Sequence, residues 1–194
     1  MNVYRYVMVT DNGLAPCIDD GLLTLCVCKP MIRLSANVND WIIAFGSKRT
    51  FGPERQLVYA ANITKKCSMV DYIEIGKNRL DSLYELKDGV LQHNGSPHHR
   101  KCSNQKNDLK GKYCLISENF WYFGKNAVPL PDEHDDLYFS GRGYTNRPIN
   151  LIKFDNFMTF LKGSKAPKKT AAPRSKAPKA GTRFWETSLP KAIT

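Results

Sequence analysis

The stretches 41-WIIAF-45 and 57-LVYAANI-63 are the part of the chain that most clearly decides its fold. Both are short, apolar, rich in β-branched and aromatic residues, and bounded by turn-forming residues, which is typical of β-strands. Similar stretches occupy residues 3–9, 22–28, 112–117 and 119–123. Residues 83–93 add a hairpin, because Asp88-Gly89 supplies the positive φ values of a tight turn. A succession of short strands favours a barrel over a layered α/β sheet.

One clear helix is predicted near the C-terminal end, over residues 149–162. Its apolar residues recur at helical spacing and form a single stripe. They are Leu151, Phe154, Met158 and Leu161. Asn146 is a candidate N-cap and Gly163 a stop signal. Shorter helical turns are expected at 30–38 and 69–75. The predicted fold class is therefore α+β: a strand-rich, partly closed β-barrel with this helix packed on it.

The positive charge lies mainly in the C-terminal tail. The 194 residues include 29 Lys and Arg against 18 Asp and Glu, and nine of those basic residues with one acid fall within 162–194. Residues 164–183 combine Lys, Arg, Pro and Ala, and such a segment cannot bury enough apolar surface to offset its chain entropy. We expect one domain over 1–163 and a disordered basic tail over 164–194. Phe184-Trp185 within the tail is a candidate contact for a protein partner.

The apolar runs are short. None approaches the ~20 residues of a membrane helix, and the first residues lack the apolar core of a secretory signal. The chain is therefore predicted to be intracellular, in cytoplasm, nucleus or a virion, without a membrane partner. Its six cysteines are expected to be reduced, because Cys26, Cys28 and Cys114 lie in apolar strands, where a thiol packs as a small hydrophobic group.

Possible metal ligands gather at His93, His98, His99 and Cys102. Their spacing lacks the second ligand pair typical of a zinc site, and basic neighbours oppose a cation, so no metal is predicted. The sequence carries no Gly-x-Ser-x-Gly, phosphate-loop or dinucleotide-binding motif. No nucleophile is therefore marked locally, and the question of a cofactor stays open.

Aromatic and polar residues near strand ends favour a nucleotide site, where bases stack on rings and phosphates meet cations. Candidates for base or nucleotide contacts are Trp41, Ser47, Tyr59 and Tyr84. Candidates for phosphate contacts are Arg33, Lys48, Arg142, Lys168, Lys169 and Arg174. Candidates for acid–base catalysis are His98, Asp81 and Asp108.

The acidic run 132-DEHDD-136 follows Pro129-Leu130-Pro131 and is expected on a loop. A solvated charge cluster is the preferred interpretation. A second role for this run would be to hold the basic tail when nucleic acid is absent.

Several short motifs follow one another in a distinctive order along residues 1–163. They are Asp11-x-Gly13-x-Ala15-Pro16, Thr24-Leu25-x-x-Cys28-Lys29-Pro30-x-Ile32-Arg33, Asp40-Trp41-Ile42 with Gly46-Ser47, Leu57-Val58-Tyr59-Ala60, Asp81-x-Leu83-Tyr84, Ser96-x-His98, Leu115-Ile116-Ser117-x-x-Phe120-x-Tyr122-Phe123-Gly124 and Ala127-Val128-x-Leu130-Pro131. Together they resemble the second nucleotide modification associated domain family. Strands 41–45 and 57–63 also resemble, at fold level, those of base-reading barrels.

The family resemblance implies a role beside systems that hypermodify DNA bases in phages, bacteria, large viruses and some eukaryotes. One position departs from the expected pattern. After Gly141-Arg142-Gly143 the chain carries Tyr144, where relatives are expected to carry His. If that His acts in the family, its replacement puts activity in doubt here.

Three functions stay open at this point. The first is a DNA base hypermodification-associated protein that binds nucleic acid and holds a modified or flipped base or nucleotide. The second is an enzyme acting on nucleotides or DNA bases, a transferase or hydrolase. The third is a non-enzymatic DNA-packaging or docking protein, whose sign would be a domain without a polar concave pocket.

Binding to duplex DNA should depend steeply on salt. If the tail neutralises about seven phosphates, the log–log slope of affinity against salt should approach about −6, because counterions are released. Deleting residues 164–194 should flatten this slope, as measured by fluorescence anisotropy over a salt series. A slope unchanged by the deletion would contradict the tail's part in binding.

Overall fold

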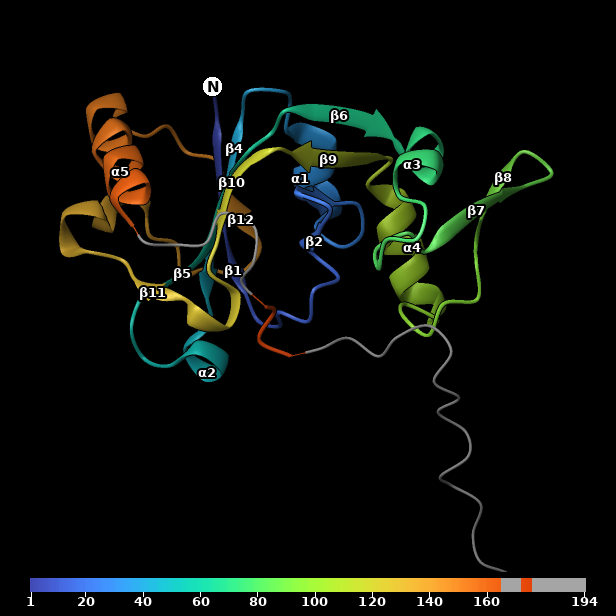
Figure 1. Cartoon of the computed structure of the whole chain (residues 1–194), viewed down its shortest axis with the longest axis horizontal. Coiled ribbons are helices and arrows are strands. Elements are labelled where there is room, and N and C mark those ends of the chain that lie inside the picture. The colour runs from blue at the N-terminus through green and yellow to red at the C-terminus, as the bar shows by residue number, and fades with distance from the viewer. Residues whose placement is uncertain (165–171, 176–194) are drawn as a thin grey trace, which may run out of the picture.

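The computed structural model describes residues 1–164 and 172–175 (Figure 1). Its largest sheet has the strand order β10-β5-β4-β1-β12, with β11 also pairing with β5. The strands are β1 (Val3–Met8), β4 (Trp41–Gly46), β5 (Gln56–Asn62), β10 (Asn119–Tyr122), β11 (Val128–Pro129) and β12 (Tyr144–Thr145). Strand β1 runs parallel to β4, with Val3 opposite Trp41, while β5 is antiparallel to β4.

A second sheet has the order β2-β3-β9-β6, and a hairpin stands apart from it. The strands are β2 (Cys17–Asp19), β3 (Leu22–Leu25), β9 (Tyr113–Ser117) and β6 (Lys65–Ser68), and the hairpin is β7 (Tyr84–Lys87) with β8 (Val90–His93). The helices are α1 (Pro30–Ser35), α2 (Lys48–Phe51), α3 (Met69–Ile75), α4 (Cys102–Lys110) and α5 (Leu151–Gly163), with 3₁₀ turns η1 (Gly124–Asn126) and η2 (Asp132–Leu137).

The large sheet is covered on both faces (Figure 1). Along β4, Trp41, Ile43 and Phe45 share a buried cluster with Phe154, Phe157 and Leu161 of α5. The alternate residues of β4 face the other way and join a cluster with apolar residues of β3, β9 and α1. Successive side chains of a strand point to opposite faces, so burial of both faces explains why 41-WIIAF-45 is continuously apolar.

The predicted barrel is wrong. The fold is mixed α+β and strand-rich, but no sheet within the described residues closes on itself. The physical reason is that α5 fills one face of the large sheet and the second sheet with α1 fills the other. The central strands therefore have no lumen to enclose. Short strands with turn signals occur equally in barrels and in open layered sheets, and the sequence pattern alone did not separate the two.

The predicted strands and the C-terminal helix are confirmed. The bounds of each expected strand differ from the observed bounds by at most three residues. The hairpin turns at Asp88-Gly89, where φ is +51° and +74°. The helix begins later than predicted, because Asn150, whose side chain accepts from two backbone N–H groups, is the cap in place of Asn146. Helix α4 was missed, since its sequence Cys-Ser-Asn-Gln-Lys-Asn-Asp-Leu-Lys has no apolar stripe.

The expectation that all cysteines are reduced is wrong. Cys26 and Cys114 are joined by a disulfide, while Cys17, Cys28, Cys67 and Cys102 are free. Leu25 of β3 lies opposite Leu115 of β9, so the next facing positions of this antiparallel pair are Cys26 and Cys114. The two residues are 88 positions apart in the chain. Their proximity is therefore a property of strand pairing that spacing does not reveal.

No helix among the described residues is long and apolar enough to cross a membrane. Lys168, Lys169 and Phe184-Trp185 lie outside the described residues. Disorder of residues 165–171 and 176–194 stays a prediction, while residues 172–175 are described and contact the domain. The protein partner of the tail and the intracellular location also stay predictions.

Replacing Phe157 by Ala should lower the free energy of unfolding by about 3–5 kcal/mol, because the ring is fully buried between α5 and the large sheet. Ile152→Ala on the same helix is the matched control, since Ile152 is 72% exposed, and it should change stability by less than about 0.5 kcal/mol. Urea unfolding followed by circular dichroism measures both. Equal losses in the two variants would contradict the packing of α5 described above.

Candidate active site

The carboxylate of Asp108, on α4, is 1% exposed and is surrounded by hydrogen-bonding groups. Its Oδ1 accepts from the backbone N–H of Cys28 at 2.7 Å. Its Oδ2 accepts from the hydroxyl of Tyr84 at 3.0 Å and lies 2.5 Å from Nδ1 of His99. A buried carboxylate is costly unless donors surround it. Asp108 therefore holds together three segments: the end of β3, strand β7 and the loop before α4.

The backbone at Cys28 is held in an unusual conformation. Cys28 and Lys29 have left-handed φ values of +58° and +41° just before Pro30 starts α1. Such values cost a non-glycine residue on the order of 1–3 kcal/mol and cluster at functional sites. Asp108 accepts from the N–H of Cys28, and the Nε of Arg33 donates to its carbonyl at 2.8 Å. These two contacts maintain the conformation and fix the direction of the thiol.

Cys28, His99 and Asp108 form what we call the thiol relay. The Sγ of Cys28 lies 3.7 Å from Nε2 of His99, and the other ring nitrogen of His99 faces Asp108. A nucleophile, a base and a group that orients the base, in this order, are the parts of a covalent active site. The hydrogen bonds to Asp108 and then to Cys28 raise the pKa of His99 to about 10. A cationic imidazole beside a cysteine stabilises the nucleophilic thiolate.

A cavity of about 430 Å³ opens beside the relay, and Cys28 forms part of its wall. This volume falls within the range of about 300–1,000 Å³ typical of small-molecule sites. The other walls include Tyr6, Ile32 and Tyr144, with Lys29 as a polar group. The ammonium of Lys29 lies 4.1 Å from the centre of the Tyr6 ring, and burial lowers its pKa. The Tyr6 ring is fully buried, so the cavity offers the ring of Tyr144 and the cation of Lys29 next to the thiol.

Cys28, His99 and Asp108 could also hold a metal ion, since one ligand atom from each lies within 4.8 Å of the others. Thiolate, imidazole and carboxylate are all zinc ligands. However, Asp108 meets Nδ1 of His99 while Cys28 faces Nε2, so the ring lies between the thiol and the carboxylate. Three ligands of one ion would instead converge on one point. The geometry favours the relay.

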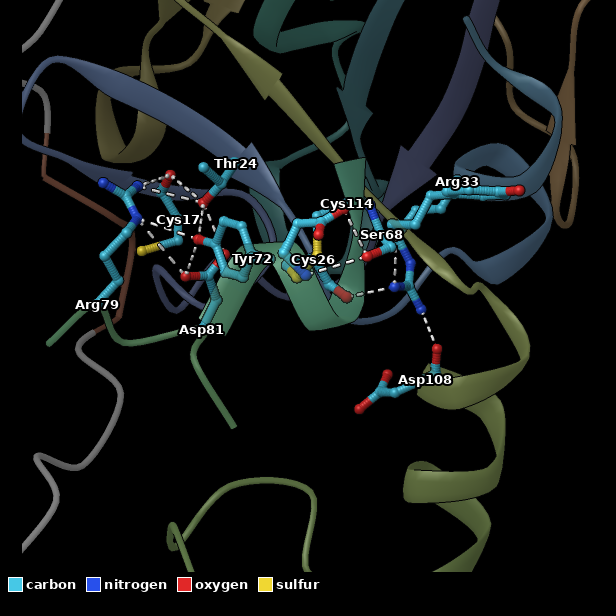
Figure 2. The surroundings of a disulfide bond; sticks show 12 residues. Cys17, Thr24, Cys26, Arg33, Ser68, Tyr72, Arg79, Asp81, Asp108 and Cys114 are labelled. Carbon is cyan, nitrogen blue, oxygen red and sulfur yellow. Dashed lines mark hydrogen bonds and ion pairs between the residues drawn. A yellow bond between two sulfur atoms is a disulfide. The ribbon is translucent and has the colours of Figure 1, made fainter. Parts of the chain in front are cut away.

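The guanidinium of Arg33 is fully buried and donates to the main chain. Its Nε donates to the carbonyl of Cys28, and its other nitrogens donate to the carbonyls of Cys26, Tyr113 and Asp108. Figure 2 shows its reach to the Asp108 carbonyl beside the disulfide. Burial lowers the pKa of Arg33 to about 10. Arg33 was predicted to contact phosphate, but the structure places it as a support beneath the thiol relay.

Asp81, one of the predicted acid–base residues, belongs to a separate buried network (Figure 2). It accepts from the hydroxyls of Thr24 at 2.6 Å and Tyr72 at 2.8 Å, and Nε of Arg79 lies 3.8 Å away. Burial raises the pKa of Asp81, and the hydrogen bonds oppose this shift. The structure therefore does not bring Asp81 and Asp108 into one network.

His98, the third predicted acid–base residue, is 9% exposed. Its carbonyl oxygen lies 2.7 Å from Nε2 of His93, and its N–H donates to the Ser96 hydroxyl at 3.3 Å. The neighbouring residue, His99, is the one that meets Asp108. The structure thus places the relay imidazole one position further along the chain than the predicted residue.

Of the residues predicted to contact a base, Trp41 and Tyr59 lie in the core. Trp41 packs edge-on against Phe154 of α5 with ring centres 5.4 Å apart, and the hydroxyl of Tyr59 lies 3.1 Å from that of Tyr6. Ser47 caps α2 by position, and its buried hydroxyl has no hydrogen-bond partner among the described residues. Tyr84 is the one that the structure places against the thiol relay.

The predicted phosphate contacts are scattered. Lys48 begins α2 and lines a cavity together with Arg55. Cys28 is not among the residues that line this cavity. Arg142 lines a third cavity of about 860 Å³. Tyr144, which was expected to depart from the family pattern, lines both this cavity and the one beside the relay.

Sequence reasoning missed Cys28 and His99 as a pair. The signals were present but indirect. Cys28-Lys29-Pro30 belongs to a motif of the family resemblance, and His99 belongs to a histidine-rich stretch from which only His98 was named as an acid–base residue. No sequence spacing links them, because helix α4 must fold back for Asp108 to meet both.

The fold and the site define an α+β protein with open sheets and a thiol relay in which Asp108 is buried and Cys28 and His99 are half-buried. A family model described as nucleotide modification associated domain 2 matches residues 1–83 and 77–180. The chain therefore belongs to the nucleotide modification associated domain 2 family, as the motifs predicted, and this membership associates it with nucleotide modification. No curated protein and no solved structure matches the chain.

The stability of the protein should fall as the pH rises from about 7 to 10 through loss of the His99 charge. The contact with Asp108 raises the pKa of His99 from 6.5 to about 10 in the folded state. Its contribution is therefore complete below pH 6.5 and is lost as the pH passes through 10. His99→Gln should remove roughly 1–3 kcal/mol at pH 7, a value discounted for partial exposure, and little at pH 10.

Denaturant titrations of the wild type and His99→Gln at pH 6, 8 and 10 measure this difference. Asp108→Asn is a second variant, because it removes the charge that raises the pKa of His99. A difference between wild type and His99→Gln that stays constant across this range would contradict the ion pair.

Proposed function

We propose that this protein is an enzyme of nucleotide modification that transfers or hydrolyses a group through a covalent bond to Cys28. The observation that carries the proposal is the thiol relay, whose sulfur lies 3.7 Å from His99 and lines a cavity. This choice adopts the second of the three functions left open by the sequence. Its acid–base residues are His99 and Asp108 in place of His98 and Asp81.

The chemistry follows from the order of the groups. The Cys28 thiolate attacks an electrophilic carbonyl carbon of the substrate, and a sulfur–carbon bond forms. The leaving group departs with the proton that His99 holds. An acceptor, which is water in hydrolysis or an amine or hydroxyl in transfer, then attacks the thioester and gives its proton to His99. The sulfur–carbon bond breaks, and the thiolate and imidazolium are restored.

The cavity supports a nucleotide or modified base as the substrate. Tyr144 supplies aromatic surface, and Lys29 supplies a cation within the same cavity. Rings that stack on a base and cations that face phosphates are the usual parts of such a site. The basic tail would add affinity for nucleic acid that does not depend on sequence. A packaging protein would not need a thiol relay beside a cavity.

The reactivity of Cys28 provides a direct test. At pH 7, iodoacetamide should modify Cys28 at least about tenfold faster than Cys102, because Nε2 of His99 lies 3.7 Å from the Cys28 sulfur, where a base can activate a nucleophile. Cys102 is the internal control, since it is free and exposed. His99→Gln should slow the modification of Cys28 toward that of Cys102. Peptide mass spectrometry without reductant measures each rate and leaves the Cys26–Cys114 disulfide intact.

Function is tested in cells that express the wild type, Cys28→Ala or the control Cys102→Ala, by mass spectrometry of nucleosides from their DNA and nucleotide pools. A change in nucleosides should require Cys28 and not Cys102. If Cys28→Ala retains the change, the catalytic role of the thiol is wrong. If the Cys28→Ala variant still binds modified nucleosides but makes no product, substrate binding and catalysis are separate properties of the cavity.

A further inference from the structure

A short part of the basic tail lies against the domain, although it is far from its contacts in the chain. Residues 172–175, Ala-Pro-Arg-Ser, pass beside the loop after β1 and the start of η1. The backbone N–H of Lys125 donates to the carbonyl of Ala172 at 3.0 Å. The backbone N–H of Ser175 donates to the carbonyl of Asp11 at 2.9 Å. The segment is therefore bound at both ends by main-chain hydrogen bonds.

Asp11 is the centre of this contact. Its side chain is 2% exposed, and its Oδ2 accepts from the backbone N–H of Arg174 at 3.1 Å. The hydroxyl of Tyr122 donates to the same carboxylate at 2.7 and 2.9 Å. The hydroxyl of Ser175 donates to the main-chain carbonyl of Asp11 at 3.1 Å. A buried carboxylate needs such donors, and one of them comes from the tail.

Two glycines make room for the segment. A Cβ on Gly124, where φ is +54°, would collide with the carbonyl oxygen of Ala172. A Cβ on Gly13, where φ is +82°, would come within 3.2 Å of Pro173. The guanidinium of Arg174 also lies 5.1 Å from the centre of the Phe51 ring, a cation–π geometry. The surface thus fits a small residue, a proline and a basic residue in that order.

This pattern occurs three times in the tail. Ala166-Pro167-Lys168 and Ala177-Pro178-Lys179 repeat the docked Ala172-Pro173-Arg174. A segment of this pattern offers the same carbonyl, the same two backbone N–H groups and a cation for Phe51. Only the Ser175 hydroxyl is particular to the middle copy. The copy that begins at Ala166 has little chain between it and Ser164 with which to reach the site. The copy that begins at Ala177 has a longer connection than the docked copy.

We propose that Asp11, Gly13, Phe51, Gly124 and Lys125 form a binding site for Ala-Pro-Arg/Lys segments, and that its occupant is this chain's own tail. Ala172–Ser175 is the preferred occupant, and Ala177–Ala180 takes its place when the first is blocked. The acidic run 132–136 was considered for holding the tail, but Asp132 and Asp135 pair with Arg55. The site does not depend on the chemistry of Cys28.

The test uses the full chain and measures amide hydrogen exchange by nuclear magnetic resonance. In the wild type, the N–H groups of Arg174 and Ser175 should exchange at least about tenfold more slowly than those of Lys179 and Ala180, because Arg174 and Ser175 donate to Asp11. Arg174→Pro removes the N–H that donates to Asp11 as well as the guanidinium. In this variant, protection should move to Lys179 and Ala180.

Lys169→Pro is the matched control, because it adds a proline to the tail outside the docked segment, and it should leave Arg174 and Ser175 protected. A double variant, Arg174→Pro with Lys179→Pro, should protect neither segment. All substitutions lie in the tail, so the domain stays folded. Two results overturn the proposal: no protection of Arg174 and Ser175 in the wild type, or no protection of Lys179 and Ala180 in Arg174→Pro.

Discussion

The structure depends on a guanidinium that is wholly removed from water. Arg33 donates to the carbonyls of Cys26, Cys28, Tyr113 and Asp108, and so ties the end of β3 to β9 and α4. A buried cation is tolerated only when its donors are satisfied, and here main-chain oxygens supply that need. Gly111 allows the approach, since a Cβ there would collide with Arg33. The thiol relay is assembled on this support.

The strands and the last helix were readable because each carries its own local signal. In 41-WIIAF-45 the β-branched and aromatic residues show a strand directly, and the stripe from Leu151 to Leu161 shows a helix. The closure of the sheet had no such signal. Whether β4 faces a lumen or a helix depends on the position at which α5 packs. This position is set by contacts between residues more than a hundred positions apart in the chain.

The sequence identified some residues of the site but not how they are arranged. Asp108 and Tyr84 were named from sequence, but for roles in different groups, and the structure joins them through one hydrogen bond. Cys28 and His99 were hidden because their meeting requires two left-handed residues after β3 and the polar helix α4, neither of which has an apolar pattern. Trp41 shows the opposite error, since a strand-end tryptophan is more often packed in the core than exposed to a base.

Asp108 contacts both the backbone of Cys28, the proposed nucleophile, and the ring of His99, its proposed base. A substitution of Asp108 would therefore change the local backbone and the proposed reactive groups together. This residue leaves little freedom to alter one without the other. Diversification toward new substrates has to fall on the walls opposite the sulfur. Tyr144 is one such wall residue, and it lies outside the relay. Laboratory evolution of altered selectivity would do best to begin there.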